Sequence, residues 1–544
     1  MSIQTCIQTL VNNLPGNTAV ISPGSRNVPV IFALNQLKEK CYSIIDERSA
    51  GFVALGIAKQ SQSPVILSCT SGTATLNYYP AIAEAFYARI PLIVITADRP
   101  SEHIDAWDGQ AIRQKNVFQN HIRASFQTPE IYDDDSGFLN VARNVSKCLI
   151  NDIPGPIHIN VPIREPFYDF EDTITKSSTK VETKKNHQTI SLKNLAKHIN
   201  VPIQHQKVMI FNGMDDGQHI TIENDHAVVL SDITSATKSN VSYWDAMLFS
   251  CLSKPNGFKA LKVLQPDILF STGTTTISKG LKRFLSIYKP KHHFHISNFE
   301  EVGDMFGTQP QIVSPSDIIQ HVSQENEDSP SLAYLNSWTS LTIAFRHKFS
   351  QLDWTGYHEF GIINHILDRA NTSHIIHFSN SMPVRYASFL TDIHNAKNRV
   401  YANRGTSGID GCTSTALGCA LATDQSVLLI TGDVAFFYDI NALFNKHLPN
   451  NFKIIILNNQ GGGIFNMISG PENLGNAKHF QNTPHYMNAI SLCEHFDITY
   501  FESKDSSSFR SRFNAFIAFN GCAIFEVKTV GSDNENAFNA FKKL

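Results

Sequence analysis

Two polar residues, Asp433 and Asn459, stand just after two strongly apolar segments in the last third of the chain. Asp433 comes soon after the segment VLLIT (427–431), and Asn459 comes soon after KIIIL (453–457). Apolar runs of this length are typical of strands buried on both faces of a parallel sheet. Parallel strands present their carboxyl ends at one edge, where open α/β sheets bind ligands. We therefore expect the two side chains to lie close together.

The oxygen atoms at this edge suit a hard cation. Mg²⁺ prefers oxygen ligands in octahedral geometry and usually shares them with the phosphates of a bound molecule. The Asp433 carboxylate, the Asn459 amide oxygen and the Gly461 carbonyl can act as ligands beside a diphosphate and water. The other interpretation is that Asp and Asn only form turns after two ordinary strands. The glycine run 461–463 favours the ligand site, because glycines let the backbone approach a ligand closely.

The spacing resembles the signature of thiamine diphosphate (ThDP) enzymes, in which a GDG triplet precedes an NN pair. Here Gly432, Asp433 and Val434 stand where the signature has GDG, so the last glycine is replaced. The resemblance implies that Asp433, Asn459 and Gly461 bind Mg²⁺, or Mn²⁺ in its place. It also implies that Gly432 contacts the cofactor.

ThDP enzymes also need a glutamate that hydrogen-bonds the aminopyrimidine ring and promotes removal of a proton. Glu47, in the segment YSIIDER (42–48), is the candidate. We expect a short strand that ends at Glu47, a helix of small residues over 49–60, and a turn at 70–74 that opens a further helix. A carboxyl buried in such a contact should have a raised pKa. The other interpretation is a solvated helix start, which is typical of a DER triplet.

Longer segments make the resemblance specific. They are SPGSR (22–26), DERSAGFVALGIAK (46–59), CTSGTATLNYYPAIAEA (69–85), TADRP (96–100), GQAIRQ (109–114), GPIHINVPIREP (155–166), NSMPVR (380–385), NRGTSGIDG (403–411) and NNQGGGIF (458–465). These segments resemble the 2-succinyl-5-enolpyruvyl-6-hydroxy-3-cyclohexene-1-carboxylate (SEPHCHC) synthases of menaquinone biosynthesis. They cover the first and last thirds of the chain, whereas the middle third is similar mainly at TISKGLKRF (276–284).

In that family, 2-oxoglutarate is decarboxylated and the resulting succinyl carbanion adds in a 1,4 sense to isochorismate. Both substrates are dicarboxylates, and the planar fork of arginine pairs well with a carboxylate. The resemblance places substrate-binding groups at Ser25, Arg26, Arg99, Gln110, Lys279, Arg385 and Arg404. Gly109 departs from the pattern, since some relatives carry asparagine at this position beside Gln110.

The resemblance also assigns groups around the cofactor and the reacting atoms. The cofactor contacts are Ser381, Ser407, Ile409 and Ile464, and an apolar wall beside the substrates is formed by Phe465 and Ile468. Ile409 matches the bulky residue that holds ThDP bent, which brings its two rings together. The other interpretation of Ile464, Phe465 and Ile468 is ordinary helix core.

The elements that must position these residues are buried strands that alternate with helices. Apolar runs such as 92–96 and 208–211 recur, and turn residues and a helical pattern follow each of them. Between the two strands of the metal motif, we expect a helix over 439–446. This alternation predicts parallel α/β sheets.

We expect three doubly wound parallel-sheet domains of the ThDP enzyme type. Their predicted limits are 1–180, 190–345 and 350–544. The segments 169–188 and 323–331 are polar and lack apolar periodicity, so they are the predicted linkers.

Composition excludes several classes of protein. The 544 residues include 45 Lys and Arg against 48 Asp and Glu, a net charge of -3, whereas a nucleic-acid binder needs a basic excess or stripe. No apolar run is long enough to span a membrane, and the N-terminus lacks the basic start of a secretion signal. The 9 cysteines form no CxxC pair, which predicts free thiols rather than disulfides or zinc ligands. We therefore expect a cytoplasmic enzyme.

The resemblance implies an active site between subunits of a homodimer or homotetramer, with Glu47 from one chain and Asp433 and Asn459 from another. The first alternative is another ThDP enzyme, such as an acetolactate synthase or a simple 2-oxoacid decarboxylase. Acetolactate synthases usually bind FAD, and the segment 190–345 has no convincing dinucleotide-binding loop. The second alternative is a nucleotide-binding or regulatory protein that kept the fold and lost catalysis. The presence of Glu47, Asp433 and Asn459 argues against it.

Overall fold

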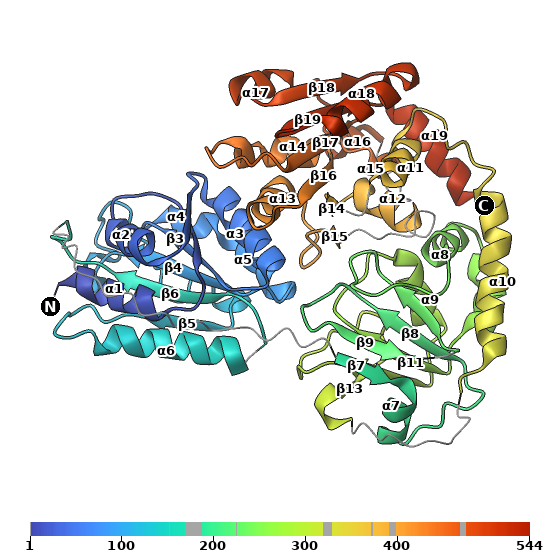
Figure 1. Cartoon of the computed structure of the whole chain (residues 1–544), viewed down its shortest axis with the longest axis horizontal. Helices are drawn as coiled ribbons and strands as arrows, with labels where there is room; N and C mark the ends of the chain where they lie inside the picture. The colour runs from blue at the N-terminus through green and yellow to red at the C-terminus, as the bar shows by residue number, and fades with distance from the viewer. Residues whose placement is uncertain are drawn as a thin grey trace.

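Three parallel sheets with helices on their faces, and one small two-stranded sheet, form the architecture of the chain (Figure 1). The computed structural model describes residues 2–151, 153–168, 188–224, 226–318, 329–370, 374–390, 399–467 and 475–544. The predicted fold class, parallel α/β sheets of the ThDP enzyme type, is confirmed. The exact domain limits stay a prediction, and most of both predicted linkers lies outside the described residues.

The first sheet has six strands in the order β2-β1-β3-β4-β6-β5. Its strands are β1 (Thr18–Ile21), β2 (Lys40–Ser43), β3 (Val65–Cys69), β4 (Leu92–Asp98), β5 (Ala124–Gln127) and β6 (Ile157–Pro162). Its helices are α1 (Ile3–Asn13), α2 (Val28–Leu37), α3 (Glu47–Ser61), α4 (Thr73–Asn77), α5 (Tyr79–Tyr87) and α6 (Ser136–Asn151).

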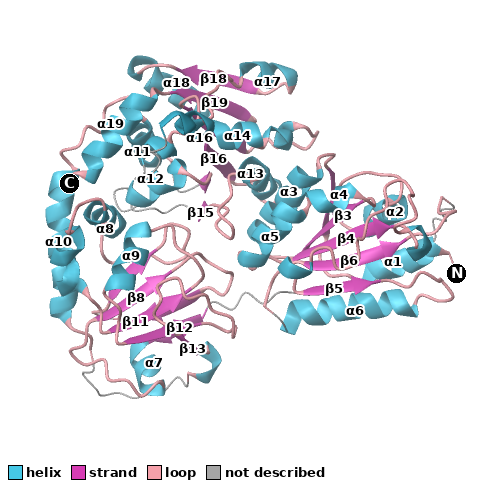
Figure 2. Cartoon of the chain, turned by 180° about the vertical axis from the view of Figure 1, so that it is seen from behind, coloured by secondary structure: helices cyan, strands magenta, loops and turns pink. Residues whose placement is uncertain are grey.

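Helices cover both faces of this sheet (Figure 2). On β4, Ile93 and Ile95 pack in the same apolar cluster as residues of α1, α2 and α6, whereas Leu92 and Val94 pack with α3 and α5. Successive strand residues point to opposite faces, so a strand covered on both sides is apolar throughout. This burial explains why the strand is a continuous apolar run and not an alternating one.

The central sheet has five strands in the order β10-β8-β11-β12-β13. They are β8 (Val208–Asn212), β10 (Val228–Ser231), β11 (Ile268–Thr272), β12 (His292–Ile296) and β13 (Gln311–Val313), and the two-stranded sheet is β7 (Gln188–Ser191) with β9 (Ile220–Glu223). The helices of this region are α7 (Leu192–His198), α8 (Trp244–Leu252), α9 (Lys279–Ile287) and α10 (Leu332–Phe349).

The third sheet, in the order β15-β14-β16-β17-β19-β18, repeats the topology of the first. Its strands are β14 (His374–Phe378), β15 (Val400–Tyr401), β16 (Ser426–Gly432), β17 (Phe452–Asn458), β18 (Thr499–Ser503) and β19 (Ala523–Lys528). Its helices are α11 (Glu359–Arg369), α12 (Met382–Leu390), α13 (Cys412–Leu421), α14 (Asp433–Tyr438), α15 (Ile464–Met467), α16 (Lys478–Asn482), α17 (Ile490–His495), α18 (Ser506–Ala518) and α19 (Gly531–Lys542). Numbered within each sheet, the strand order is 2-1-3-4-6-5 in both.

Helices α3 and α13 join the first and third sheets through a close crossing, and they lie side by side in Figure 1. A Cβ added at Gly56 of α3 would lie 2.0 Å from the Thr415 carbonyl oxygen of α13. A Cβ at Gly418 of α13 would lie 2.1 Å from the Val53 carbonyl oxygen of α3. The backbones approach this closely only because neither glycine carries a side chain.

Two predicted elements were wrong. The strand before Glu47 ends at Ser43, and Glu47 is the first residue of α3, because the Asp46 carboxylate accepts from the Ser49 N–H and caps the helix. The helix expected over 439–446 is absent. Instead, α14 begins at Asp433 and ends before Asp439, and a short 3-10 turn follows.

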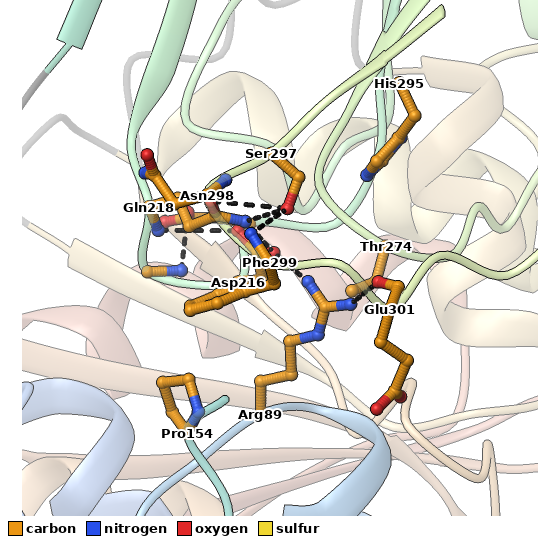
Figure 3. A network of polar contacts seen from close by, with 12 residues as sticks. Arg89, Pro154, Asp216, Gln218, Thr274, His295, Ser297, Asn298, Phe299 and Glu301 are labelled. Carbon is orange, nitrogen blue, oxygen red and sulfur yellow. Dashed lines mark hydrogen bonds and ion pairs between the residues drawn. The ribbon is translucent and has the colours of Figure 1, made fainter. Parts of the chain in front are cut away.

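The first and central sheets meet at a buried ion pair (Figure 3). Arg89, just after α5, donates to Asp216 Oδ2 at 2.8 Å, and both side chains are buried. Gln218 donates to the same carboxylate oxygen at 2.7 Å, and the Phe299 ring packs against the guanidinium. A pocket of about 180 Å³ lies beside this pair and is also lined by Tyr401 of the third sheet.

No helix within the described ranges combines the length and the apolar character needed to cross a membrane.

Candidate active site

Asp433 lies at the carboxyl end of β16, and its side chain is buried. Its Oδ1 accepts from the Val434 N–H at 2.7 Å, and its Oδ2 accepts from the Gly461 N–H at 3.0 Å. His485 Nε2 lies 3.3 Å from Oδ2 without hydrogen-bonding geometry. Burial raises the pKa of Asp433, while these N–H donors and His485 oppose that shift. The carboxylate is therefore held in a fixed orientation in a site of low polarity.

Asn459 follows β17, which pairs with β16 in parallel register, and both Asn459 and Asp433 act on Glu359. Its Nδ2 donates to Glu359 Oε1 at 2.7 Å, which leaves Oδ1 as the free oxygen of the amide. Glu359 is buried, and burial and the nearby Asp433 raise its pKa to about 7 although the hydrogen bond from Asn459 lowers it. The two predicted metal ligands are thus brought together by adjacent strands.

This edge fits Mg²⁺ with a diphosphate. A carboxylate, an amide oxygen and a backbone carbonyl are the hard ligands that Mg²⁺ selects. A Cβ added at Gly432 meets no atom within 4 Å, so open space borders the carboxyl end of β16 beside Asp433. In the described part of the chain no group of three His, Cys, Asp or Glu could hold a metal by itself. Asp433, Asn459 and the Gly461 carbonyl could fill only part of an octahedral shell, and diphosphate oxygens could fill the rest.

A cluster of cations lies next to this edge. Arg385 lies on α12 and Arg404 lies in the loop after β15, whereas Lys279 and Lys282 lie on α9 of the central region. Burial and then Arg404 lower the pKa of Arg385 to about 10, and burial and then Arg385 lower that of Lys279. Burial and then Arg404 also lower the pKa of Lys282. Charges that repel one another in a partly buried place indicate a site for anions.

The loop 403–411 carries Arg404 and is held from two sides. The Glu84 carboxylate of α5 accepts from the N–H groups of Gly405 and Thr406 and from the Thr406 hydroxyl. Asn380 donates to the Gly408 carbonyl and accepts from Arg404 through its Oδ1 at 2.9 Å. The loop is therefore fixed by a buried carboxylate of one sheet and by the end of a strand of another.

Three of the predicted contact residues have left-handed backbone conformations. The φ angles are 78° at Ser381, 64° at Ser407 and 57° at Gln110. Non-glycine residues pay a steric penalty in this region, and such residues gather at functional sites. Ser25 and Gln110 are exposed at the carboxyl edge of the first sheet, and Gly72 contacts the backbone of Gln110.

Two predicted arginines of the first sheet share one carboxylate. Arg26 follows β1 and donates to the Ile163 carbonyl at 2.8 Å and to Glu165 Oε1 at 2.7 Å. Arg99 follows β4, donates to the Gly109 carbonyl at 2.8 Å and lies 3.8 Å from Glu165. The Glu165 side chain is 67% exposed, so the carboxylate of a ligand can reach the position that the Glu165 carboxylate occupies.

Glu47 is half-buried at the start of α3. Burial raises its pKa most, Asp46 raises it further, and a hydrogen bond with Asn77 lowers it. Among the described residues, neither Asp433 nor Asn459 interacts with its carboxylate.

The predicted apolar groups lie in two segments. Ile409 is half-buried in the loop that follows β15, and Ile464 and Phe465 are half-buried at the start of α15. The Phe465 ring lies 3.1 Å from a Cβ built at Gly462. Ile468 lies outside the described residues.

Comparisons with known proteins agree with this geometry. Thiamine pyrophosphate (TPP) is another name for ThDP. Residues 4–127 match the N-terminal TPP-binding domain of the thiamine pyrophosphate enzymes, and residues 385–527 match their C-terminal TPP-binding domain. A protein of Flavobacterium johnsoniae is 35% identical over 537 residues, covering 95% of this chain and 94% of the relative. A protein of Flavobacterium psychrophilum is 37% identical, and the match covers 96% of this chain and 96% of the relative. A protein of Cytophaga hutchinsonii is 34% identical, and the match covers 96% of this chain and 95% of the relative.

All three relatives are named 2-succinyl-5-enolpyruvyl-6-hydroxy-3-cyclohexene-1-carboxylate synthase. The chain belongs to the SEPHCHC synthase family. Membership confirms the predicted family and makes the chain a ThDP-dependent enzyme. The acetolactate synthase alternative loses its support, because the similarity to SEPHCHC synthases extends through the central region.

Four residues of the site were missed from the sequence. Lys282 had a signal, because it stands one helical turn from Lys279 and so shares its face. Glu84, Glu359 and His485 had none, since each reaches its partner only through the tertiary fold. Glu359 is 100 residues from Asn459, and Glu84 is more than 300 residues from the loop that it holds.

Proposed function

We propose that the chain catalyses the SEPHCHC synthase reaction with Mg²⁺ and ThDP. In this reaction 2-oxoglutarate loses CO2, and the succinyl carbon that becomes nucleophilic forms a new carbon–carbon bond with isochorismate in a 1,4 sense. When bound, ThDP supplies the nucleophilic carbon and the electron sink that the decarboxylation needs. The observation that carries the proposal is the cation cluster beside an edge fitted for Mg²⁺ and diphosphate.

The residues of the metal edge hold the cofactor. Asp433, Asn459 and the carbonyl of Gly461 bind Mg²⁺, with Mn²⁺ as a substitute, and the ion neutralises the diphosphate. Gly432 and Ser407 border the diphosphate, and the positive end of α14 favours its charge. Ser381, Ile409 and Ile464 contact the rest of the cofactor.

Glu47 acts on a proton. Its carboxyl, with a pKa raised by burial, hydrogen-bonds the ring nitrogen of the aminopyrimidine and promotes proton transfer there. Asn77 orients the carboxyl through a hydrogen bond.

The cations bind the carboxylates of both substrates. Arg385, Arg404 and Lys279 supply positive charge from the third and central sheets, while Arg26 and Arg99 supply it from the first. Ser25 and Gln110 add neutral hydrogen-bonding groups, and Phe465 and Ile468 exclude water from the reacting carbon. Dry surroundings strengthen each of these electrostatic contacts.

A complete site requires two chains. Glu47, Arg26 and Arg99 lie at the edge of the first sheet, whereas Asp433 and Arg404 lie at the edge of the third. Among the described residues no ion pair joins the first group to the second. We infer a homodimer, or a homotetramer made of two such dimers, in which the first sheet of one chain faces the third sheet of the other.

The test is a two-substrate assay. Purified protein with Mg²⁺ and ThDP is expected to release CO2 from 2-oxoglutarate and, with isochorismate added, to form SEPHCHC detected by mass spectrometry. Glu47→Gln should keep the fold and lose about 100-fold or more of the turnover, the usual cost of losing a general acid or base. Glu39→Gln, an exposed glutamate of the same sheet, is the matched control. Absence of SEPHCHC with the wild-type chain would sink the proposal, and near-normal turnover of Glu47→Gln would remove the role of Glu47.

A further inference from the structure

The asparagines that end β17 are each tied to a buried carboxylate. Asn458 donates its Nδ2 to Glu526 Oε1 at 2.6 Å, and Asn459 donates its Nδ2 to Glu359 Oε1 at 2.7 Å. Successive residues at the end of a strand point to opposite faces, so the two pairs lie on opposite sides of the sheet. Glu526 is also bound by Tyr500 and by a backbone N–H, which makes its pair part of the internal core.

Glu359 itself is fixed by a chain of buried hydrogen bonds. Its backbone N–H donates to Asn534 Oδ1 at 2.8 Å. Asn534 Nδ2 donates to Thr529 Oγ1 at 3.0 Å. Because Thr529 Oγ1 accepts this bond, its hydroxyl hydrogen is available to donate to the Glu359 carboxyl, and the two side chains form a hydrogen bond. The Thr529 N–H donates in turn to the Asn458 carbonyl at 2.9 Å. Glu359 and Asn534 are at most 2% exposed, so this chain of contacts has little freedom.

An asparagine amide can turn its oxygen or its nitrogen toward a metal, and only the oxygen is a ligand. A carboxyl group offers an accepting oxygen in either protonation state, so it draws the amide nitrogen of Asn459 to itself. The amide oxygen then points away from Glu359. We propose that Glu359 is a positioning residue that presents Asn459 Oδ1 to the divalent ion of the metal edge.

The orientation of the Asn459 amide has a large effect on Mg²⁺ binding, because this ion tolerates little departure from octahedral geometry and dehydrates reluctantly. Removal of a group that orients a metal ligand typically weakens metal binding by about 10–100-fold. The inference rests on the proposed Mg²⁺ site, and it adds a residue that no motif contains.

The experiment measures metal binding and not only turnover. Mg²⁺ is titrated calorimetrically into protein that holds excess ThDP, and Mn²⁺ binding is followed by the electron paramagnetic resonance of the free ion. Glu359→Leu removes the acceptor at similar volume and is expected to weaken Mg²⁺ binding by about 10–100-fold. Glu359→Gln keeps an accepting oxygen, so its affinity for Mg²⁺ is expected to stay within about threefold of wild type.

Two further variants separate positioning from a general loss of structure. Glu526→Leu removes the equivalent carboxylate from Asn458 and is expected to lower the melting temperature with Mg²⁺ affinity changed by less than about threefold. Thr529→Val removes one support of Glu359 and is expected to weaken Mg²⁺ binding by about 2–5-fold, a measurable loss even where Glu359→Leu does not fold.

The outcomes distinguish this inference from the function on which it rests. Wild-type protein that binds no Mg²⁺ with ThDP would show that the metal edge itself is wrong. Wild-type binding that Glu359→Leu or Thr529→Val leaves unchanged would overturn the positioning role alone. Equal weakening by Glu359→Leu and Glu526→Leu, or weakening by Glu359→Gln as large as by Glu359→Leu, would also overturn it.

Discussion

At the scale of single residues, positive charge is concentrated where we propose that the substrates bind. The net charge of the chain is only -3, yet four cations lie near one another. Besides burial, Arg404 lowers the pKa of Arg385 and of Lys282, and Arg385 lowers the pKa of Lys279. Asp232 and Glu84 are the carboxylates that act on Arg404. Bound dicarboxylates relieve the repulsion among the cations, and this relief contributes to binding.

Lys279 allows this idea to be tested with a control on the same helix. Lys279→Ala removes one cation that faces Arg385, and it is expected to raise the KM for a dicarboxylate substrate by about tenfold, since hydrogen bonds to charged groups are worth about 1.5–3 kcal/mol. Arg283→Ala removes an exposed cation of α9 and should change the KM by less than about twofold. Steady-state kinetics with each substrate varied in turn measures both. An unchanged KM for both substrates in Lys279→Ala would exclude Lys279 from the site.

At the scale of elements, the predicted residues follow the carboxyl ends of strands in two sheets of equal topology. Arg26 follows β1 and Arg99 follows β4, while Asp433 follows β16 and Asn459 follows β17. In the strand order 2-1-3-4-6-5, the direction in which successive strands are added reverses between strands 1 and 3. Open α/β sheets bind ligands at the carboxyl ends of the strands beside such a reversal. Repetition of the topology therefore provides two binding edges, and the site draws on both.

The crossing of α3 and α13 is the element contact most sensitive to a single atom. Gly56→Ala places a Cβ 2.0 Å from the Thr415 carbonyl oxygen, so the helices must separate, and the midpoint of thermal unfolding is expected to fall by about 5 °C or more. Gly531→Ala at the start of α19 is the matched control, because its Cβ meets no atom within 4 Å. Calorimetric scans measure both. A Gly56→Ala chain as stable as the control would show that the helices separate at no cost.

At the scale of the whole molecule, the proposed site draws on the first sheet and on the third. Glu47 interacts with Asp46 and Asn77, whereas Asp433 interacts with Gly461 and His485. In the proposed dimer, a second copy brings its first sheet to this third sheet and completes the site. The same symmetry then completes the site of the partner.

Subunit mixing tests this arrangement directly. Glu47→Gln and Asp433→Asn are each expected to be inactive alone. After exchange of subunits, the mixture is expected to recover about a quarter of wild-type activity, because half of the dimers are mixed and each of these has one intact site. Native mass spectrometry measures the mixed dimers beside the assay. Mixed dimers without recovered activity would contradict a site shared between chains.

Local signals determined much of the fold and part of the site. The strand-length apolar runs predicted strands such as β4, β8, β16 and β17, because strands buried on both faces must be apolar throughout. Edge strands such as β5 and β18 are only partly buried and carry no such run, so they were not predicted. Asp433 and Asn459 were found because their positions follow from the strands themselves.

By itself the sequence determined the family, the parallel sheets and the residue types that can bind a metal and carboxylates, because these depend on composition, periodicity and motif. The tertiary structure decided that α9 brings Lys279 to Arg385 and Lys282 to Arg404, and that Glu359 holds Asn459. Such contacts depend on packing between segments about a hundred residues apart, and no local pattern encodes the partner of a buried polar group. The orientation of one amide at the metal edge is thus a property of the fold, while its presence there is a property of the sequence.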